Sequence, residues 1–448
     1  MYSSYRVLRP LTAALVVLLA ANAYANPASI VPGGKDPDDP TSDHAQESVD
    51  VYGGVDYSYE LDSASIVRER LGPGADPNAP LPTIRDLKFK QFRHTITPNL
   101  HVGIFRDTWL SVALPIIVTQ VRELSLDGYS DRTGSTTVQD GLLPMTGFDA
   151  RDPGTPTPGD LLFRGPTRHG LDQVHLGLGV APMNQSKDPT KPTWKIGAEI
   201  RLAVGKTMRF DPMAPDANHG VSQGVQELKF WMSFARKIGW AEPWVDMFWL
   251  VPVAAKSDSL FQDPGFGSTN TQKSQVGGIG FGVELYALDN PHDNTRISLD
   301  FGTRSEMHFE GREYTEMWEV FSYAGDSRGM GPLILDSDPT RAGVQALSHP
   351  GISNVENYLK TTAEFGIRAQ LGPHVHFSVL GDLTWVTDHV LTFADAGVDS
   401  PNDDNDLVNP GTDEVNPLHV PRVDLVGHRY RSENNFNLAL GVQGTVLF

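Results

Sequence analysis

The last thirteen residues of the chain, 436–448, read Phe-Asn-Leu-Ala-Leu-Gly-Val-Gln-Gly-Thr-Val-Leu-Phe. Apart from Gly444, every even-numbered position is large and apolar, and apart from Leu447, every odd-numbered position is small or polar. Successive side chains of a β-strand point to opposite faces, so this alternation predicts a strand with one apolar face. A soluble β-sandwich can also end on such a strand, and the fold class therefore depends on the rest of the chain.

The same alternation recurs along the whole chain. In one segment Leu110, Val112, Leu114, Ile116 and Val118 share a face. The pattern predicts about twelve strands, at residues 49–59, 87–105, 108–118, 174–180, 194–204, 228–234, 245–253, 279–287, 297–301, 359–369, 375–385 and 436–448. The aromatic segment 314–323 is either an extra strand or a short helix, which leaves a count of fourteen strands open.

The connections between the predicted strands alternate in length. Short links lie near Arg106, Asn184, Gly239, Pro291 and Pro373, and every other connection is long. Barrels of the bacterial outer membrane have an even number of strands, short periplasmic turns and long external loops. We therefore predict an all-β fold, a transmembrane up-and-down antiparallel β-barrel with long external loops and both chain ends on the periplasmic side.

The aromatic carboxy-terminal residue, Phe448, supports this reading. A terminal strand that ends in an aromatic residue resembles the last strand of Gram-negative outer-membrane β-barrel proteins, including porin-like and transporter-like ones. The resemblance implies a location in the outer membrane and contact with outer-membrane lipid and lipopolysaccharide. It also implies recognition of the terminal strand by the barrel-assembly machinery.

The amino terminus reads as an export signal. Arg6 and Arg9 precede an apolar run, Leu11 to Ala20, and Ala23-Tyr24-Ala25 is a small-x-small cleavage site. We predict a signal peptide at 1–25, a flexible periplasmic leader at 26–48 and the barrel at 49–448. Charged residues interrupt every later apolar stretch, so no transmembrane helix is expected.

Composition excludes several classes of protein. The chain has no cysteine, which rules out a disulfide scaffold. Its formal charge of -19 argues against a nucleic-acid partner. It contains no Gly-rich phosphate loop, no His-Glu-x-x-His and no nucleophile elbow, and we expect no cofactor.

The polar faces of the predicted strands carry full charges in mid-strand. A soluble antiparallel sheet with one solvated face would show the same pattern, but the export signal, Phe448 and the connection lengths favour a barrel in lipid. Its polar faces would then line the interior, and we predict an outer-membrane channel or uptake protein for small solutes with a charged, hydrated lumen. The candidate lumen and solute-binding residues are Arg93, His101, Lys195, Glu199, Arg201, Lys229, Glu284, Asp300, Arg304, Glu364, Arg368 and Asp382.

Tryptophans lie beside several of the predicted periplasmic turns. Trp109, Trp194, Trp240 and Trp244 occupy such positions, where membrane barrels carry a girdle of aromatic residues. We predict that these four residues form the periplasmic girdle.

Two alternative functions follow from other residues. His376 and Ser378 share a strand face and resemble the His-x-Ser pattern of outer-membrane phospholipase A, which would make the protein a lipid-acting barrel enzyme. Val379 follows Ser378 where that family has Asn, so we expect no enzyme. The other alternative is a structural or adhesive barrel with a plugged lumen.

Metal binding is not decided by the sequence. His374 and His376, two residues apart on a strand, can chelate a metal ion. The acidic loop 394–431 can hold a divalent cation through its carboxylates, although its spacing does not fit an EF-hand.

Overall fold

A computed structural model describes residues 31, 50–70, 81–128, 130–262, 272–290, 292–329, 331–400 and 406–448. The predicted signal peptide and nearly all of the predicted leader lie outside these residues. Within them, seventeen strands belong to a single sheet. No helix of the described part is long and apolar enough to cross a membrane.

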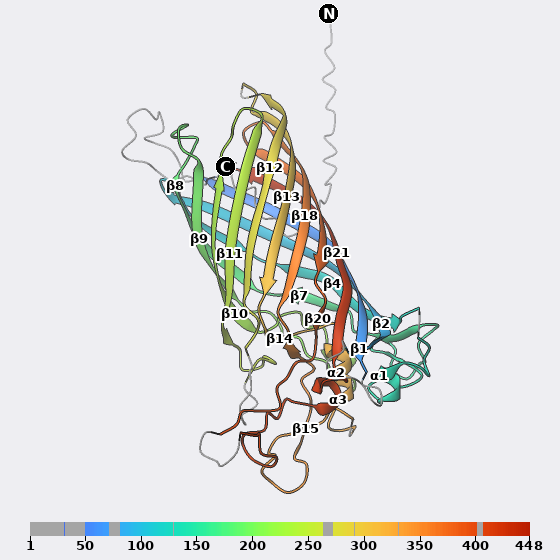
Figure 1. Cartoon of the computed structure of the whole chain (residues 1–448). Coiled ribbons are helices and arrows are strands. Elements are labelled where there is room, and N and C mark those ends of the chain that lie inside the picture. Colours follow the sequence, from blue (N-terminus) through green and yellow to red (C-terminus); the bar gives the residue numbers. More distant parts are fainter. Residues whose placement is uncertain are drawn as a thin grey trace, which may run out of the picture.

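The sheet closes on itself as a barrel. Each long strand pairs antiparallel with the next along the chain, and the last, β21 (Tyr430–Leu447), returns to pair with the first, β1 (Val51–Glu69). β3 and β4 both pair with β2 and together make one barrel strand, and β7 continues into β8 in the same way. The described residues thus form a closed barrel of twelve antiparallel strands, which confirms the predicted fold and count (Figure 1).

The other strands either form the barrel wall or are short, and the helices are short as well. The wall strands are β2 (Thr83–Phe105), β3 (Thr108–Ala113), β4 (Ile116–Leu126), β7 (Arg168–Leu171), β8 (Val174–Met183), β9 (Thr193–Leu202), β10 (Val225–Ala235), β11 (Ala241–Ala255), β12 (Val276–Asn290), β13 (Thr295–His308), β18 (Tyr358–Leu371) and β19 (Val375–Val386). The short strands are β5 (Phe148–Asp149), β6 (Leu161–Arg164), β14 (Gly311–Glu313), β15 (Leu335–Asp336), β16 (Ala346–Leu347), β17 (Ser353–Val355) and β20 (His389–Val390). The helices are α1 (Thr136–Gln139), η1 (Pro215–Ala217), α2 (Trp318–Ala324) and α3 (Pro421–Asp424).

The outer surface of the barrel is apolar. Leu100, Phe230, Phe281 and Ile367 are 41–57% exposed, although each lies in the middle of a wall strand. Their sequence neighbours on the other face, such as His101, Trp231 and Arg368, line the barrel interior. A soluble sandwich would bury the apolar face, whereas a barrel in lipid presents it outward. The exposed apolar band therefore identifies a membrane-spanning barrel.

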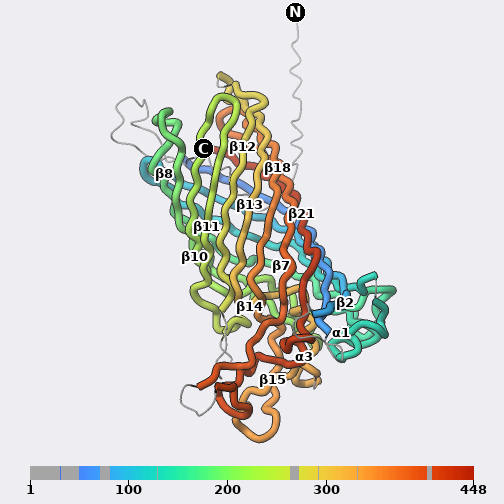
Figure 2. Tube along the Cα trace, viewed as in Figure 1, coloured from blue at the N-terminus to red at the C-terminus, as the bar shows by residue number. Residues whose placement is uncertain are grey.

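The two ends of the barrel differ. Figure 1 shows the C-terminus and the short turns at one end, and Figure 2 traces the long loops to the other. Left-handed backbone conformations tighten the short turns at Arg106 (φ 45°), Gly239 (φ 62°) and Gly372 (φ 70°). This agrees with the predicted alternation of short periplasmic and long external connections.

The main hydrophobic core lies among the external loops, not in the barrel interior. The buried apolar side chains include Trp318 and Phe321 of α2, Leu142 of the loop after β4, Leu162 of β6, and Val423 of α3. They pack on wall residues at the external end of β1, β2 and β4. We call the described parts of segments 130–165, 206–222, 311–355 and 391–428 the cap.

The segment 314–323 is part of this cap. It contains the short helix α2, and the alternative of fourteen strands is therefore wrong. Met317, Trp318, Val320 and Phe321 are all fully buried, because the helix is surrounded by other cap segments. A strand would have left half of these side chains facing water.

The predicted tryptophan girdle is wrong for two of its four members. Trp240 is 68% exposed at a periplasmic turn, and Trp194 stacks on Phe234 with ring centroids 5.5 Å apart. Trp109 and Trp244 instead point inward and are only 5% and 6% exposed. In each strand the outward-facing residues occupy alternate positions, and Trp109 and Trp244 fall on the inward-facing positions between them. The prediction considered only that they lie beside turns.

Candidate functional site

The barrel interior holds two cavities. The inner cavity, of about 290 Å³, is lined by residues near the periplasmic turns, and the outer cavity, of about 390 Å³, is lined by wall residues and by the cap segment around Tyr314. Both volumes fall near the lower end of the roughly 300–1,000 Å³ typical of small-molecule sites. A small solute could therefore occupy either.

All twelve candidate lumen residues lie on the inward face. Six line the inner cavity, four line the outer cavity, and the remaining two form ion pairs with lining residues. Whether any of them binds a solute stays a prediction. The inner cavity is lined by His101, Lys195, Glu199, Lys229, Glu284 and Arg368, and the outer cavity by Arg93, Arg304, Glu364 and Asp382. The two ion-paired residues are Arg201 and Asp300.

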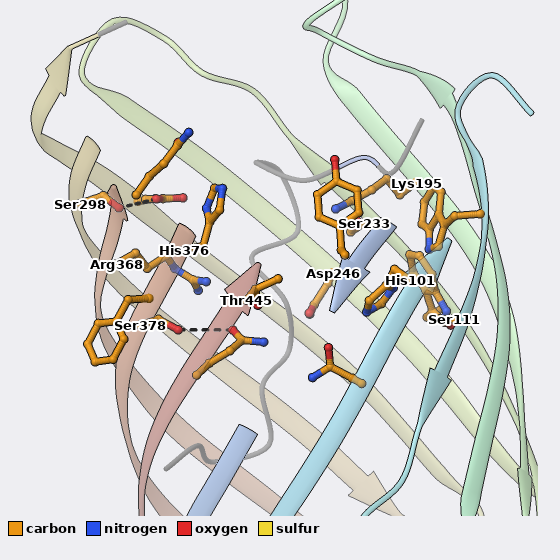
Figure 3. Close-up of a pocket in the computed structure, with 18 of the residues that line it drawn as sticks. His101, Ser111, Lys195, Ser233, Asp246, Ser298, Arg368, His376, Ser378 and Thr445 are labelled. Carbon is orange, nitrogen blue, oxygen red and sulfur yellow. Dashed lines mark hydrogen bonds between the residues drawn. The ribbon is translucent and has the colours of Figure 1, made fainter. Parts of the chain in front are cut away.

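Residues from two sides of the barrel line the inner cavity (Figure 3). Lys195, His101 and Asp246 come from one side of the barrel, and Arg368 and His376 come from β18 and β19 on the other. Aromatic rings of Trp109, Trp231 and Phe248 also line it. The cavity therefore offers both apolar surface and charge.

The outer cavity is more acidic. Seven carboxylates and four Lys or Arg side chains line it. Most of the described basic groups there are engaged: Arg93 lies 3.5 Å from Glu60, and the guanidinium of Arg122 donates to the Thr315 carbonyl at 2.9 Å. The lining residues with charge are Glu60, Asp62, Glu306, Glu313, Glu316, Glu364, Asp382, Arg93, Arg122, Arg304 and Lys360.

An ion-pair network on the barrel wall joins residues of the two cavity linings. Arg304 of β13 donates to both carboxylate oxygens of Asp246 at 3.1 and 3.0 Å and to Glu364 at 2.8 Å. Asp246 lines the inner cavity, whereas Arg304 and Glu364 line the outer one. Bidentate arginine–carboxylate pairs are strong and geometrically specific. Because β11, β12, β13 and β18 pair consecutively, the network runs along one side of the barrel wall, where the linings of the two cavities meet.

A second buried ion pair ties the cap to the barrel wall. Arg168 of β7 donates to Glu319 of α2 at 2.7 and 3.0 Å, and the two side chains are 1% and 3% exposed. Arg168 also donates to the carbonyls of Gly220 and Arg209, each at 3.0 Å, and its guanidinium stacks over the Trp318 ring. One wall residue thus anchors two cap segments.

Sequence reasoning missed this anchor. Arg168 falls in a segment that reads as a polar loop and Glu319 in the aromatic segment 314–323, and the two residues lie 151 positions apart. The aromatic density around Trp318 was the one local signal that this loop packs against something.

Two buried titratable groups give the cap opposite responses to pH. Burial, reinforced by Arg312, lowers the pKa of His349 to about 3, and its Nδ1 accepts a hydrogen bond from the Gly351 amide. Burial raises the pKa of Asp424 to about 6, against hydrogen bonds from Val420 and Ala394 and the nearby His419. In a loosened cap the pKa of each group would return to its ordinary value.

The sign of each effect follows from proton linkage. Between pH 6.5 and 3 a loosened cap gains a proton on His349 that the packed cap refuses, so acid favours loosening. Between pH 6 and 3.8 the packed cap holds a proton on Asp424 that the loosened cap releases, so acid favours packing. The two effects oppose each other in the wild-type protein.

Single variants should separate these effects. As the pH falls from 6 to 4, we expect the cap of the Asp424→Asn variant to loosen by up to about tenfold per pH unit, because only the His349 effect remains. Over the same range we expect the cap of the His349→Gln variant to tighten by a similar factor. Proteolysis of the cap at each pH measures both. Equal pH slopes in the two variants and the wild type would contradict this account.

The side chains of His376 and Ser378 are not joined in the described structure. Ser378 donates to Gln443 Oε1 at 3.3 Å, and no hydrogen bond joins it to His376 within the described chain. The described residues contain no group of three or more His, Asp or Glu that could hold a metal ion. Part of the acidic loop, 401–405, lies outside the described residues, and its affinity for divalent cations stays untested.

Comparisons with known proteins return likenesses among solved structures only. No protein-family model matches the chain, and no curated protein matches it. An outer membrane channel from Pseudomonas putida F1 is 9% identical, with a TM-score of 0.39 over 92% of this chain and 99% of that one. A FadL homologue from Pseudomonas aeruginosa is 8% identical, with a TM-score of 0.33 over 89% and 90% of the two chains. The outer membrane protease OmpT from Escherichia coli is 8% identical, with a TM-score of 0.28 over 90% and 99%.

The barrel's own geometry decides what kind of protein this is. The sheet is closed, its outer face is apolar, and its long loops gather at the end opposite the C-terminus. Lipid tolerates a sheet only when it has no open edge. The chain is therefore an outer-membrane β-barrel protein.

Proposed function

We propose that this protein is an outer-membrane channel for the uptake of small solutes, and that its cap holds it closed in the state described above. The observation that carries the proposal is the location of the core. The main apolar cluster fills the cap, while the barrel interior holds two cavities with charged linings. A purely structural barrel needs no such space, because inward side chains can fill a small barrel.

The charged interior would select the solute. Lumen charges set selectivity through their arrangement across a pore, and here the outer cavity is acidic while cations and aromatic rings line the inner one. A solute would meet the cap first, then the outer cavity, then the Arg304 network, and then the inner cavity. The twelve lumen residues act in this proposal as the wall of the path.

The membrane contacts are part of the same proposal. The exposed apolar band would face outer-membrane lipid and, at its external rim, lipopolysaccharide. Phe448 follows directly after the terminal strand β21 (Tyr430–Leu447) and is 78% exposed. An exposed terminal aromatic residue is available to the barrel-assembly machinery.

Solute flux into proteoliposomes tests the function. The mature chain is refolded, and a shift in gel mobility on heating establishes that it is folded. We expect slow uptake of small charged solutes by the wild type and at least tenfold faster uptake once the cap is loosened. Flux that equals that of protein-free liposomes in both cases would overturn the proposal.

A plugged structural barrel is the second candidate, and the completeness of cap packing favours it. Trp318 and Phe321 are fully buried, and Arg168 and Glu319 are almost so. The same flux experiment separates the two functions, because a structural barrel would have no solute path behind the cap.

A further inference from the structure

We propose that the inner cavity is a binding site for a small aromatic carboxylate, with its ring against Trp109 and Trp231 and its carboxylate toward Arg368 and His376. The inference rests on the proposed function and names a class of solute for it. It stands on three observations: a built aromatic wall, buried donors without partners, and carboxylates that the protein already satisfies.

The aromatic wall is formed by rings that lie flat on glycines. A Cβ on Gly179 would come within 2.3 Å of the Trp109 ring, and one on Gly197 within 2.5 Å of the Trp231 ring. The two rings are 6.2 Å apart and tilted by 40°. Only glycine allows the indoles to lie this close to the backbone. They leave space beside them for another planar ring, which would stack in an offset or tilted arrangement.

Three buried polar atoms of the lining have no hydrogen-bond partner among the described residues. They are Ser233 Oγ, Arg368 Nε and His376 Nε2. Ser233 is only 3% exposed, and all three residues line the inner cavity (Figure 3). A buried donor without a hydrogen-bond partner costs free energy. A ligand that accepts a hydrogen bond from such a donor removes this cost, which favours its binding. Arg368 donates from Nη2 to Asp300 and leaves its Nε unpaired, Ser233 is a donor, and His376 donates in one tautomer.

The carboxylates of the same lining are already engaged. Both oxygens of Asp246 accept from Arg304 at 3.0 and 3.1 Å, and Glu199 accepts from Arg201 at 2.8 Å. Ser298 donates to Glu284. An incoming solute therefore meets satisfied acidic groups and unsatisfied donors, which favours an anion.

Two lysines add positive charge to the same space. The Lys195 side chain is buried against the cavity, and the Lys229 ammonium lies 4.9 Å from the Phe248 ring centroid. Charge-assisted hydrogen bonds from Arg or Lys to a carboxylate are about twice as strong as neutral ones. An aromatic carboxylate satisfies both the ring wall and the donor wall, whereas an aliphatic cation satisfies neither.

Binding of benzoate to the folded mature chain tests the site. Titration is followed by tryptophan fluorescence and by calorimetry, with benzyl alcohol and benzylamine as probes that keep the ring and lose the carboxylate. We expect saturable benzoate binding, at least tenfold tighter than either comparison probe. Equal affinity for benzoate and benzyl alcohol, or no saturation, would overturn the inference.

Variants assign the two walls. Arg368→Gln and Trp231→Leu should each weaken benzoate binding at least tenfold, while Lys191→Ala, at an exposed periplasmic turn outside the lining, should leave it unchanged. Arg368→Lys keeps the positive charge, so it should bind benzoate more tightly than Arg368→Gln does. Unchanged binding in both Arg368→Gln and Trp231→Leu would overturn the assignment.

Flux distinguishes this inference from the proposed function. Solute flux through the barrel without benzoate saturation overturns the site and leaves the channel. Benzoate binding without flux, even after the cap is loosened, supports the site and overturns the channel.

Discussion

Replacing Glu319 with alanine is expected to open the cap. The variant leaves Arg168 buried at the wall with carbonyl partners but no countercharge. Removing one partner of a buried ion pair costs about 3–5 kcal/mol, because the remaining charge is desolvated and unpaired. That loss is enough to shift a closed cap toward an open one by a factor on the order of 10² or more. Solute flux into proteoliposomes and proteolysis of the cap should both rise.

A surface ion pair of the same cap provides the matched control. Arg328 lies 2.6 Å from Asp211, but its side chain is 58% exposed. Exposed pairs contribute about 0–1 kcal/mol, so Arg328→Ala should leave flux and proteolysis close to wild type. If Glu319→Ala and Arg328→Ala behaved alike, the buried anchor would not be what holds the cap.

Replacing Phe281 with arginine is expected to destabilise the barrel in lipid strongly. Phe281 lies in the middle of β12, outward and 57% exposed. Arginine on the lipid face at the bilayer midplane costs about 2–4 kcal/mol. Unfolding by denaturant in lipid vesicles measures the loss.

A second position on the same strand tests the depth dependence. Leu288 also faces outward, 46% exposed, but lies near the periplasmic turn. Leu288→Arg should cost only about 0–1 kcal/mol, because arginine at the interface keeps its charge in water. Equal losses at the two positions would contradict a membrane-spanning outer face, as would a loss for Phe281→Arg that persists unchanged in a lipid-free detergent.

The barrel wall could be predicted because its signal is local. Lipid on one side and a polar interior on the other impose a period of two on every strand, and the pattern is visible in the residues themselves. β1 shows where this signal ends. The prediction stopped it at Tyr59, but the strand runs to Glu69. Beyond Tyr59 the apolar residues change face, because Ala64 and Ile66 point inward and pack into the cap.

The cap could not be predicted because its contacts join distant segments. Phe321 packs on Tyr430, and Arg168 pairs with Glu319, so the aromatic segment 314–323 meets residues more than 100 positions away. The inner cavity shows the intermediate case. Its charged residues could be predicted from the alternation along each strand. The positions of the Trp109 and Trp231 rings could not, because they depend on glycines of the neighbouring strands.

Single-channel conductance tests the central claim, a solute path held closed by the cap. Glu313 and Ser353 are paired across β14 and β17, so an Asn-Gly turn can replace residues 314–352 and remove α2 without breaking the wall. In a planar bilayer we predict rare, brief openings for the wild type and long-lived discrete steps for the truncated chain. A truncated chain that is folded, by its heat-shifted gel mobility, and yet silent would contradict the claim.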